Sequence, residues 1–487
     1  MIHLYYKILV VQYSLLKIKK MKDIKMDFEA TEYFTNHIDK TKYQFINKET
    51  LEKTKIFLLD TIGVGIAGST GSNLKELKSV VTSWSNGTGC TILGTGEIVS
   101  LESAAIINAY QIHCLEYDCI HERAIVHPMA TILSSVLAYC EKKSASGFAV
   151  NGKDFLLSLI LGIDIASMLG ICATGELRFF RPATASGFGS IAALSKIEKL
   201  NIEEIKNAFG IMYSQTSGNM QAHVEGVPIL GLQTGFNSRS ALCAIDLAKA
   251  GFPGPKKVFN GVHGYFKLIE NNQFDINPII DELGKNWKVN ELSHKPYPSG
   301  RLTHGLVDAF KDLKNKNIPI NSISSILCKV PPGVFKLVSR PIKLNLTTNY
   351  AKLCAAYVGA SYFKHGFLSI QTFTDKLFLE DTEVHKLAEK IHFEIDPNAK
   401  DEKSLTPQHF KVELLNKKIV NITIENVFGN PENPMSQDEY IKKFDECCDN
   451  SKEPISKAKI KIIKDFIFNI ENEKDASSFL NIFRNEQ

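Results

Sequence analysis

The sequence lacks any Cys-x-x-Cys pair, although it contains 10 cysteines in 487 residues. Only Cys447 and Cys448 lie close together, and adjacent residues fit a metal-chelating loop poorly. A zinc knuckle, another metal site of this type or a thioredoxin-type redox site is therefore not expected. Most of the scattered cysteines have apolar neighbours, which indicates buried thiols in a reducing compartment and favours a cytoplasmic protein.

The sequence also lacks a strong charge of either sign. Its 57 basic and 53 acidic residues leave a formal net charge of +4. Nucleic-acid-binding proteins concentrate positive charge on one surface. Here, lysine clusters such as residues 459–464 are interspersed with apolar residues and are typical of solvated helix faces. We therefore expect no nucleic-acid partner.

No apolar run predicts a membrane span. Residues 8–16 are too short to cross a bilayer, and they lack the basic start and the cleavage site of a signal peptide. Residues 155–172 are longer but central in the chain and interrupted by Asp164, which favours a buried helix. We expect a soluble protein with no membrane partner. Residues 1–26 are interpreted as an extension outside the fold, with Met21 and Met26 as alternative starts.

What the sequence does contain is a dense run of titratable side chains within residues 113–143. Its members are Glu116, Asp118, His121, Glu122, Arg123 and His127. An apolar run at 129–137 follows directly, and His127-Pro128 is a suitable helix start. One interpretation is a polar loop that caps a buried helix. The other is a functional site, because a dry environment would shift the pKa values of such groups.

The pattern along the chain predicts a mainly α protein with more than one domain. Apolar residues at helical spacing dominate residues 27–272, which we assign to a large all-helical domain. Residues 273–425 mix helical and strand-like patterns, as expected for a smaller α+β domain. Residues 426–487 are helical again and are expected to return to the first domain.

The smaller domain alternates between the two kinds of pattern. The β-like runs are residues 323–330, 336–338, 391–395, 411–415 and 419–424. The helical segments are residues 302–313, 350–362 and 382–390.

Two further segments are candidates for binding residues. Arg181 and Pro182 precede small residues that lead into a helix, so free N–H groups beside an arginine could bind an anion. A purely structural turn is the competing interpretation. Residues 214–233 are polar and glycine-rich without a clear period, and they contain His223 and Glu225.

Five blocks of the sequence occur in a recognisable order: LLDTIGVGIAGS (58–69), HCLEYDCIHERAIVHP (113–128), RPATASGFGSIAAL (181–194), AKAGFPGPKKVFNGVHGY (248–265) and HKPYPSGRLTHGLVDA (294–309). In these blocks and their order the sequence resembles the MmgE/PrpD family, which includes 2-methylcitrate dehydratase, cis-aconitate decarboxylase and iminodisuccinate epimerase. The ordered set covers most of residues 50–360 and is specific, although no single block is decisive.

The resemblance implies a large all-helical domain with a smaller α+β lid domain, and an active site in the cleft between them. It also implies a homodimer that needs no cofactor. The shared chemistry is proton movement next to carboxylates, which needs a base and groups that stabilise the developing charge.

Within these blocks, the family's acidic pattern corresponds to Glu116, Tyr117 and Asp118, and its His-Pro pair corresponds to His127-Pro128. His121 follows the acidic pattern. The Lys-Pro-Tyr-Pro block is intact at 295–298.

Arg301 and His304 follow this block at family spacing. Four positions depart from the pattern: Cys119 stands for an aspartate, Arg181 for a histidine, Leu230 for a lysine and Gln233 for a second histidine. The lid tyrosine of the decarboxylases has no secure counterpart. We interpret these departures as a different substrate or reaction on the same scaffold.

The leading hypothesis is a cofactor-independent lyase that acts on a small di- or tricarboxylic acid. The predicted catalytic residues are Asp118, His121, His127 and Lys295, with a histidine as base and Asp118 orienting it. The predicted substrate-binding residues are Glu116, Arg181, His223, Arg301 and His304. The alternatives are an isomerase or epimerase on the same fold, and a non-catalytic dimer that binds a carboxylate. Proton removal and return at one carbon would tolerate the lost histidine and lysine.

Overall fold

Two long helices at the centre of the larger domain carry the apolar runs of the sequence: α6 (Pro128–Ala145) and α7 (Gly152–Cys172). Both are apolar on every face along most of their length, as expected of helices that are surrounded by protein. Pro128 occupies the first position of α6, where a missing N–H costs nothing. At the start of α7, the Asn151 side chain accepts a hydrogen bond from the Asp154 backbone N–H at 3.0 Å.

The fold is that of a computed structural model, which describes residues 29–484 except 86, 88, 400 and 402. The extension predicted at residues 1–26 lies outside the described residues. The remaining elements of the helical domain are α2 (Ala30–Lys40), α3 (Lys48–Ala67), α4 (Leu74–Ser83), β1 (Cys90–Thr91), β2 (Ile98–Val99), α5 (Leu101–His113), β3 (Ile120–His121), α8 (Arg181–Glu198), α9 (Ile202–Tyr213), α10 (Gln221–Glu225), α11 (Ile229–Lys249), α12 (Tyr265–Leu268), α13 (Asn277–Glu282) and β4 (Leu292–Ser293).

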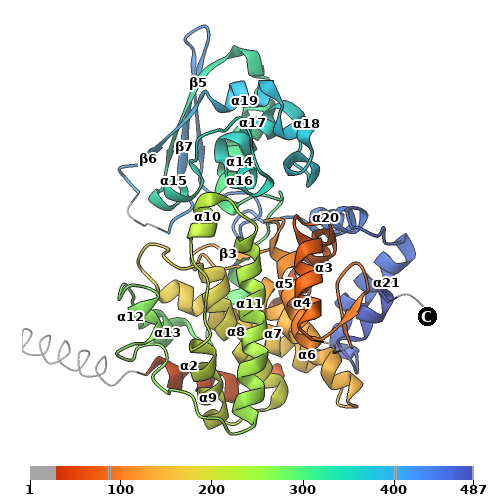
Figure 1. The fold of residues 1–487 in the computed structure, drawn as a ribbon. Coiled ribbons are helices and arrows are strands. Elements are labelled where there is room, and N and C mark those ends of the chain that lie inside the picture. The colour runs from red at the N-terminus through yellow and green to blue at the C-terminus, as the bar shows by residue number, and fades with distance from the viewer. Residues whose placement is uncertain (1–28, 86, 88, 400, 402, 485–487) are drawn as a thin grey trace, which may run out of the picture.

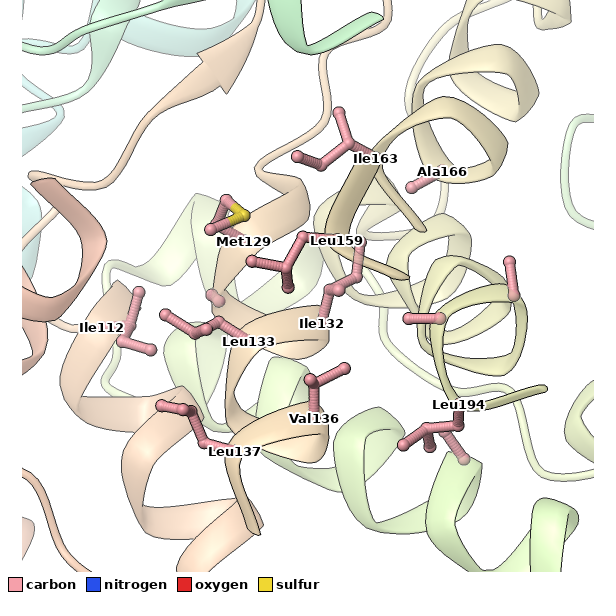
Figure 2. Packing of buried hydrophobic residues seen from close by; sticks show 14 of the residues in the cluster. Ile112, Met129, Ile132, Leu133, Val136, Leu137, Leu159, Ile163, Ala166 and Leu194 are labelled. Carbon is pink, nitrogen blue, oxygen red and sulfur yellow. The ribbon is translucent and has the colours of Figure 1, made fainter. Parts of the chain in front are cut away.

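The core of this domain surrounds α6, which packs against α5, α7, α8 and α11. Figure 2 shows fully buried side chains of α6, with Leu133 on the side of Ile112 of α5 and Ile132 beside Leu159 of α7. Burying each such side chain stabilises the fold by about 1.5–3 kcal/mol relative to leaving it exposed. The titratable segment therefore precedes one of the most deeply buried helices of the chain.

Within the described residues, α7 is the one helix that is long and apolar enough to cross a membrane, and its apolar window is completely buried in the protein. The buried helix predicted at residues 155–172 is confirmed. Asp164 within it is paired, because His37 Nε2 lies 3.1 Å away and the Lys288 backbone N–H donates to it at 2.7 Å.

The lid is built on a four-stranded sheet in the order β6-β5-β7-β8. Strand β5 is parallel to β6, with Ile326 opposite Ile391, and antiparallel to β7, with Ile326 opposite Val412. The elements of the lid are α14 (His304–Asn315), β5 (Ile323–Val330), α15 (Pro332–Val338), α16 (Thr348–Lys352), α17 (Ala355–His365), α18 (Lys376–Leu379), α19 (Thr382–Ala388), β6 (Ile391–Ile395), β7 (Gln408–Leu414) and β8 (Ile419–Ile424).

Two predictions within the lid are wrong. Residues 336–338 were expected to be β-like but end helix α15, which Pro332 starts at its first position. So short an apolar run does not distinguish strand from helix, and both edges of β5 are already paired. The single helix expected at 350–362 is divided into α16 and α17 around Leu353. Neither glycine nor proline marks this break in the sequence.

The chain finally returns to the helical domain through α20 (Gln437–Asp449) and α21 (Lys457–Phe468), which pack on α3. Figure 1 shows the sheet and its helices at one end of the molecule, with the two C-terminal helices beside the helical domain. The buried apolar residues accordingly form two large clusters, one in each domain. The predicted mainly α, two-domain fold is confirmed, while the boundaries at 272 and 425 stay predictions. Buried residues beyond 272, as far as Leu292, still pack in the core of the helical domain.

Helices α7 and α8 cross closely because both carry a glycine at the contact. A Cβ on Gly189 would lie 2.5 Å from the carbonyl oxygen of Gly162, which no real contact allows. Alanine normally stabilises a helix by about 1 kcal/mol relative to glycine. Gly189→Ala should instead lower the free energy of unfolding by about 1–3 kcal/mol, because the two helices must separate.

The matched control is Gly231→Ala in α11, where the new Cβ would meet the Tyr110 ring at an ordinary 3.4 Å. Urea denaturation should find this variant as stable as the parent or more so. If Gly189→Ala were as stable as Gly231→Ala, the close crossing would not be the reason for the glycine.

Candidate active site

The titratable segment links the end of α5 to the start of α6. His113 is the last residue of α5, and His127 is the N-cap residue of α6. Between them, Glu116 adopts φ +53°, a left-handed conformation that is uncommon for residues other than glycine. Strand β3 in the same segment pairs antiparallel with β4, with His121 opposite Leu292. This pairing brings the residues just after β4 against the acidic loop.

Asp118 is the centre of a buried charge cluster. His113 Nδ1 is hydrogen-bonded to Asp118 Oδ2 at 2.9 Å. His127 Nδ1 lies 3.2 Å from the same oxygen but is not aligned for a hydrogen bond, so this contact is electrostatic. Lys295 Nζ donates to Glu116 Oε2 at 2.9 Å and lies 3.8 Å from Asp118 Oδ1. Asp118 and Lys295 are fully buried, so water screens these charges little.

The two histidines differ in proton affinity. Burial opposes charge on His113, but the Asp118 carboxylate outweighs it and raises the pKa above its usual value. Burial, together with the Lys295 ammonium, lowers the pKa of His127. The helix dipoles act in the same directions, since a cation is favoured at the end of α5 and disfavoured at the start of α6. Near neutral pH, His113 is thus suited to act as an acid and His127 as a base.

Both carboxylates of the cluster are ionised. Burial alone would raise their pKa values, but Lys295 and His113 outweigh it at Glu116 and hold its pKa at about 2. The two histidines and Lys295 likewise hold the pKa of Asp118 well below its usual range. The ionised Asp118 can therefore orient both imidazole rings and stabilise a proton on His127.

A cavity opens beside this cluster, between the helical domain and the lid. About 80 Å³ of it is accessible to the centres of water-sized molecules, whereas one buried water needs roughly 10–15 Å³. The titratable side chains that line it are His113, Glu116, Glu122, His127, His223, Arg301 and Lys403. All other lining residues are apolar or glycine. Such a mostly apolar cavity with a few converging polar groups is typical of a small-molecule site.

Arg301 lines the cavity, but its guanidinium group is held by protein partners. Its Nε donates to Glu122 Oε1 at 2.7 Å, and its Nη groups donate to the carbonyls of Val427 and Phe428 at 3.0 and 2.6 Å. His304 lies behind Arg301 and is fully buried. Burial, with the charge of Arg301, lowers the pKa of His304 well below its usual value. His304 is therefore neutral and supports Arg301 instead of facing the cavity.

The structure does not bring His121 or Arg181 into the cavity. His121 Nε2 lies 3.1 Å from Glu291 Oε2, and the neighbouring Ile120 lines the cavity, because successive side chains of a strand face opposite ways. Arg181 is fully buried and donates to both carboxylate oxygens of Glu270, at 3.0 and 2.8 Å. This ion pair neutralises the guanidinium group that was expected to bind a substrate carboxylate.

His223 does line the cavity, and it meets a cation from the lid. Arg340 Nη2 lies 3.1 Å from His223 Nδ1 and donates to the His223 carbonyl at 2.6 Å. Burial, with this arginine, lowers the pKa of His223 to about 4, so the ring is neutral near pH 7. Glu225 is exposed and accepts a hydrogen bond from Gln221 at 2.6 Å, outside the cavity.

Sequence reasoning missed three residues of the site. His113 stands in the titratable segment, and its place in the last turn of a helix was the available signal. Arg340 and Lys352 carried no signal, because each is a lone cation in a lid segment without a motif. Arg340 Nη1 is buried without a hydrogen-bond partner, and Lys352 Nζ donates to the Cys114 carbonyl at 3.0 Å.

Arg340 and Lys352 give the site a surplus of positive charge. In the described part of the chain, neither forms an ion pair with a carboxylate, whereas Lys295 is paired with Glu116. Burial lowers the pKa of both cations, and Glu116 acts on both in the opposite direction. An anionic ligand would supply the missing negative charge.

One ligand atom each from His113, Asp118 and His127 lies within 4.8 Å of the others, which is close enough for a metal ion. Two imidazoles and a carboxylate are ordinary zinc ligands. However, the Lys295 ammonium stands 3.8 Å from Asp118 and would repel a metal cation. Both imidazoles also direct Nδ1 at the same carboxylate oxygen. This donor set fits proton transfer better than metal binding.

Comparison with known proteins shows the family to which the chain belongs. Residues 32–277 match the MmgE/PrpD N-terminal domain, and residues 297–467 match the MmgE/PrpD C-terminal domain. The chain belongs to the MmgE/PrpD family. It is 25% identical over 481 residues to the cis-aconitate decarboxylase-like protein oryM of Aspergillus oryzae, covering 94% of this chain and 98% of that one. It is 23% identical over 459 residues to the cis-aconitate decarboxylase of Homo sapiens, covering 92% and 93%.

The structure shows where three of the four residues expected to depart from the MmgE/PrpD pattern lie. Cys119 is fully buried, and burial raises the pKa of its thiol well above the usual value, so it is neutral. Leu230 lines the cavity with apolar surface. Arg181 is neutralised by Glu270 outside the cavity. The cluster around Asp118 does not depend on any of the three.

Lys295→Met should lower the free energy of unfolding by about 3–5 kcal/mol, because it leaves Glu116 without its buried cation. The double variant Lys295→Met/Glu116→Gln should recover at least half of that loss, because both charges are then gone. Urea denaturation measures both.

The control for this pair is Lys417→Met, which removes an exposed pair with Glu413 and should cost under about 1 kcal/mol. A double variant no more stable than Lys295→Met would show that the ion pair is not what Lys295 contributes.

Proposed function

We propose that this MmgE/PrpD protein is a lyase that acts on a small di- or tricarboxylic acid by removing a proton alpha to a carboxylate. One observation carries the proposal: His127, with a lowered pKa, contacts the ionised Asp118 at the wall of a cavity, near buried cations that have no carboxylate partner within the described chain. The relatives named as cis-aconitate decarboxylases support a lyase on carboxylic acids.

Substrate binding would use the surplus positive charge. A carboxylate of the substrate would accept hydrogen bonds from Arg340, whose Nη1 has a free donor, and would be attracted by Lys352. Hydrogen bonds to charged donors are worth about 1.5–3 kcal/mol. His223 is neutral and holds the guanidinium of Arg340 in place.

Proton removal would then use the histidine pair. His127 Nε2 takes the α-proton, and Asp118 stabilises the imidazolium that forms. Negative charge develops on the substrate carboxylate, where the Lys295 ammonium and the protonated His113 stabilise it. The network provides both the base and the stabilising cations before the substrate arrives, so little reorganisation is needed.

Product formation depends on the leaving group. In a dehydration, the C–H electron pair becomes the new double bond while the C–O bond breaks, and His113 gives its proton to the departing hydroxide. A decarboxylation would omit the α-proton removal: the C–C bond to CO₂ breaks, and His113 gives its proton to the carbon that keeps the electron pair. Both reactions balance without an oxidant or a reductant, so we propose a cofactor-independent enzyme.

His127→Gln should lower kcat by about 10²–10⁴-fold with little change in KM, because a general base contributes on that scale. Proton NMR in D₂O with citrate, cis-aconitate and citramalate would follow loss of C–H signals and growth of alkene signals. His392→Gln, on the exposed face of β6, is the matched control and should behave as the parent.

If His127→Gln kept full turnover, His127 would not be the general base. Deuterium incorporation with neither a new alkene nor CO₂ release would instead favour an isomerase at the same site.

The dependence of kcat/KM on pH should be bell-shaped. The base His127 must be unprotonated, and its pKa is lowered, so kcat/KM should fall only as the pH drops below about 6.5. The acid His113 must be protonated, and its pKa is raised, so the alkaline limb should lie above about 6.5. Asp118→Asn should move the alkaline limb to lower pH, because the carboxylate that raises the pKa of His113 is gone. An unmoved limb would contradict the assignment of His113.

A further inference from the structure

A buried ion pair lies behind the acidic loop, outside the cavity. It joins Asp60 of α3 to Lys443 of α20, with Lys443 Nζ 2.7 Å from Asp60 Oδ1. The two side chains are 1% and 3% exposed, so water screens their charges little. Neither residue lines the cavity. A ligand in the cavity would therefore not touch the pair, and any effect of the pair on the site must pass through the loop.

Lys443 holds Tyr117, the residue between Glu116 and Asp118. The ammonium donates a hydrogen bond to the Tyr117 carbonyl at 2.9 Å and lies 4.1 Å from the centre of the Tyr117 ring. A hydrogen bond from a charged donor is about twice as strong as one between neutral groups, and a cation over an aromatic ring adds a further attraction. One lysine thus fixes both the backbone and the side chain of Tyr117.

Tyr117 in turn connects the acidic loop to the segment that carries Lys295. Its hydroxyl donates to the Pro296 carbonyl at 3.3 Å, directly after Lys295. Lys295 itself contacts the carboxylates on both sides of Tyr117, those of Glu116 and Asp118. A displacement of Tyr117 would therefore move three charged groups of the cluster relative to the histidines.

The loop needs an external support because its backbone is irregular. Residues 114–119 form neither a helix nor a strand, and Glu116 has φ +53°. A residue other than glycine keeps such a conformation only where its surroundings enforce it. Lys443 meets the chain at the next carbonyl after this strained residue, and so it supports the loop where the support is most needed.

Two other buried cations donate to backbone carbonyls of the same segment. Lys352 of the lid donates to Cys114 at 3.0 Å, and Arg181 of α8 donates to Ala124 at 3.1 Å. Distant parts of the chain thus hold the segment at its two ends, and Lys443 holds the part that carries the carboxylates.

Stability alone does not account for the charge of the Asp60–Lys443 pair. Burying an ion pair costs much of what the attraction returns, and apolar residues in its place are often as stable or more so. Within the described residues, the Asp60 carboxylate accepts no hydrogen bond, and the Lys443 ammonium compensates its charge. The arrangement is explained if Asp60 serves to keep a charged donor buried against the Tyr117 carbonyl.

We propose that Lys443 is a positioning residue for proton transfer: through Tyr117 it sets the place of Asp118 against the two histidines. The inference deepens the proposed function and rests on it, because Asp118 orients the base there. It makes the C-terminal helix α20, 326 residues beyond Tyr117 in the chain, a working part of the active site.

The test uses Lys443→Met and the double variant Lys443→Met/Asp60→Asn in the full-length protein. The single variant leaves Asp60 buried without its cation and should lower the midpoint of urea denaturation. The double variant removes one charge of each sign and should recover at least half of that loss. It still lacks the donor to Tyr117, so its kcat should stay lowered by about 10²-fold, the scale of a misplacement of about 1 Å.

The same double variant should keep KM within about threefold of the parent value, because Arg340 and Lys352 of the proposed carboxylate site are unchanged. The assay would use whichever of citrate, cis-aconitate and citramalate the parent converts fastest. Lys442→Met is the matched control, since Lys442 is the neighbouring residue of α20, is exposed and pairs only with the exposed Glu446. It should behave as the parent in every measurement.

A readout that needs no substrate is the pKa of His113. Its charge environment is that of Asp118, Glu116 and Lys295, so removing the distant pair acts on it through the position of Asp118. An opposite charge close by shifts a pKa by about 1–3 units, so the pKa of His113 should fall by about half a unit or more in the double variant. NMR of protein labelled with ¹³C at histidine Cε1 measures it, with His113→Gln to assign the signal.

The outcomes separate this inference from the proposed function. If kcat recovered together with the unfolding midpoint in the double variant, Lys443 would only compensate Asp60, and the positioning role would be overturned. A pKa of His113 equal to that of the parent would overturn it as well. If the parent converted none of the acids, the proposed function would fail, and the pKa of His113 would still decide whether Lys443 positions the loop.

Discussion

The burial of one ionised carboxylate, Asp118, constrains the whole site. Removing such a charge from water costs several kcal/mol unless cations and hydrogen bonds surround it. The end of α5 supplies His113, the start of α6 supplies His127, and the segment after β4 supplies Lys295. These three elements meet only because α6 is embedded in the core and β3 pairs with β4. The packing of the apolar helices thus positions the polar cluster.

The lid completes what the helical domain begins. Each domain has its own apolar core, and the cavity lies where the two meet. The helical domain contributes the histidines, while the lid contributes Arg340 and Lys352, which have no carboxylate partner among the described residues. Under the proposed mechanism, proton transfer and anion binding would therefore come from different domains, and relative movement of the domains would change both.

The family departures have a common physical consequence. Leu230, which stands where the resemblance implies a lysine, gives the cavity wall apolar surface, and Arg181 is paired with Glu270 outside the cavity, while the cluster around Asp118 keeps both histidines. Ile125 also lines the cavity with an apolar side chain, although its φ is +50°.

The sequence alone determined the fold class, most strands of the lid, and the blocks that hold Asp118, His127 and Lys295, because helical and strand periods and short motifs are local properties. It could not determine which way side chains face or what they meet across the fold. Ile120 faces the cavity where His121 was expected, since register sets the face of a strand. Arg181 finds Glu270, and Arg340 reaches His223, only after distant segments pack together. Long-range pairing decides which charges are neutralised and which remain for a ligand, and that is a property of the tertiary structure.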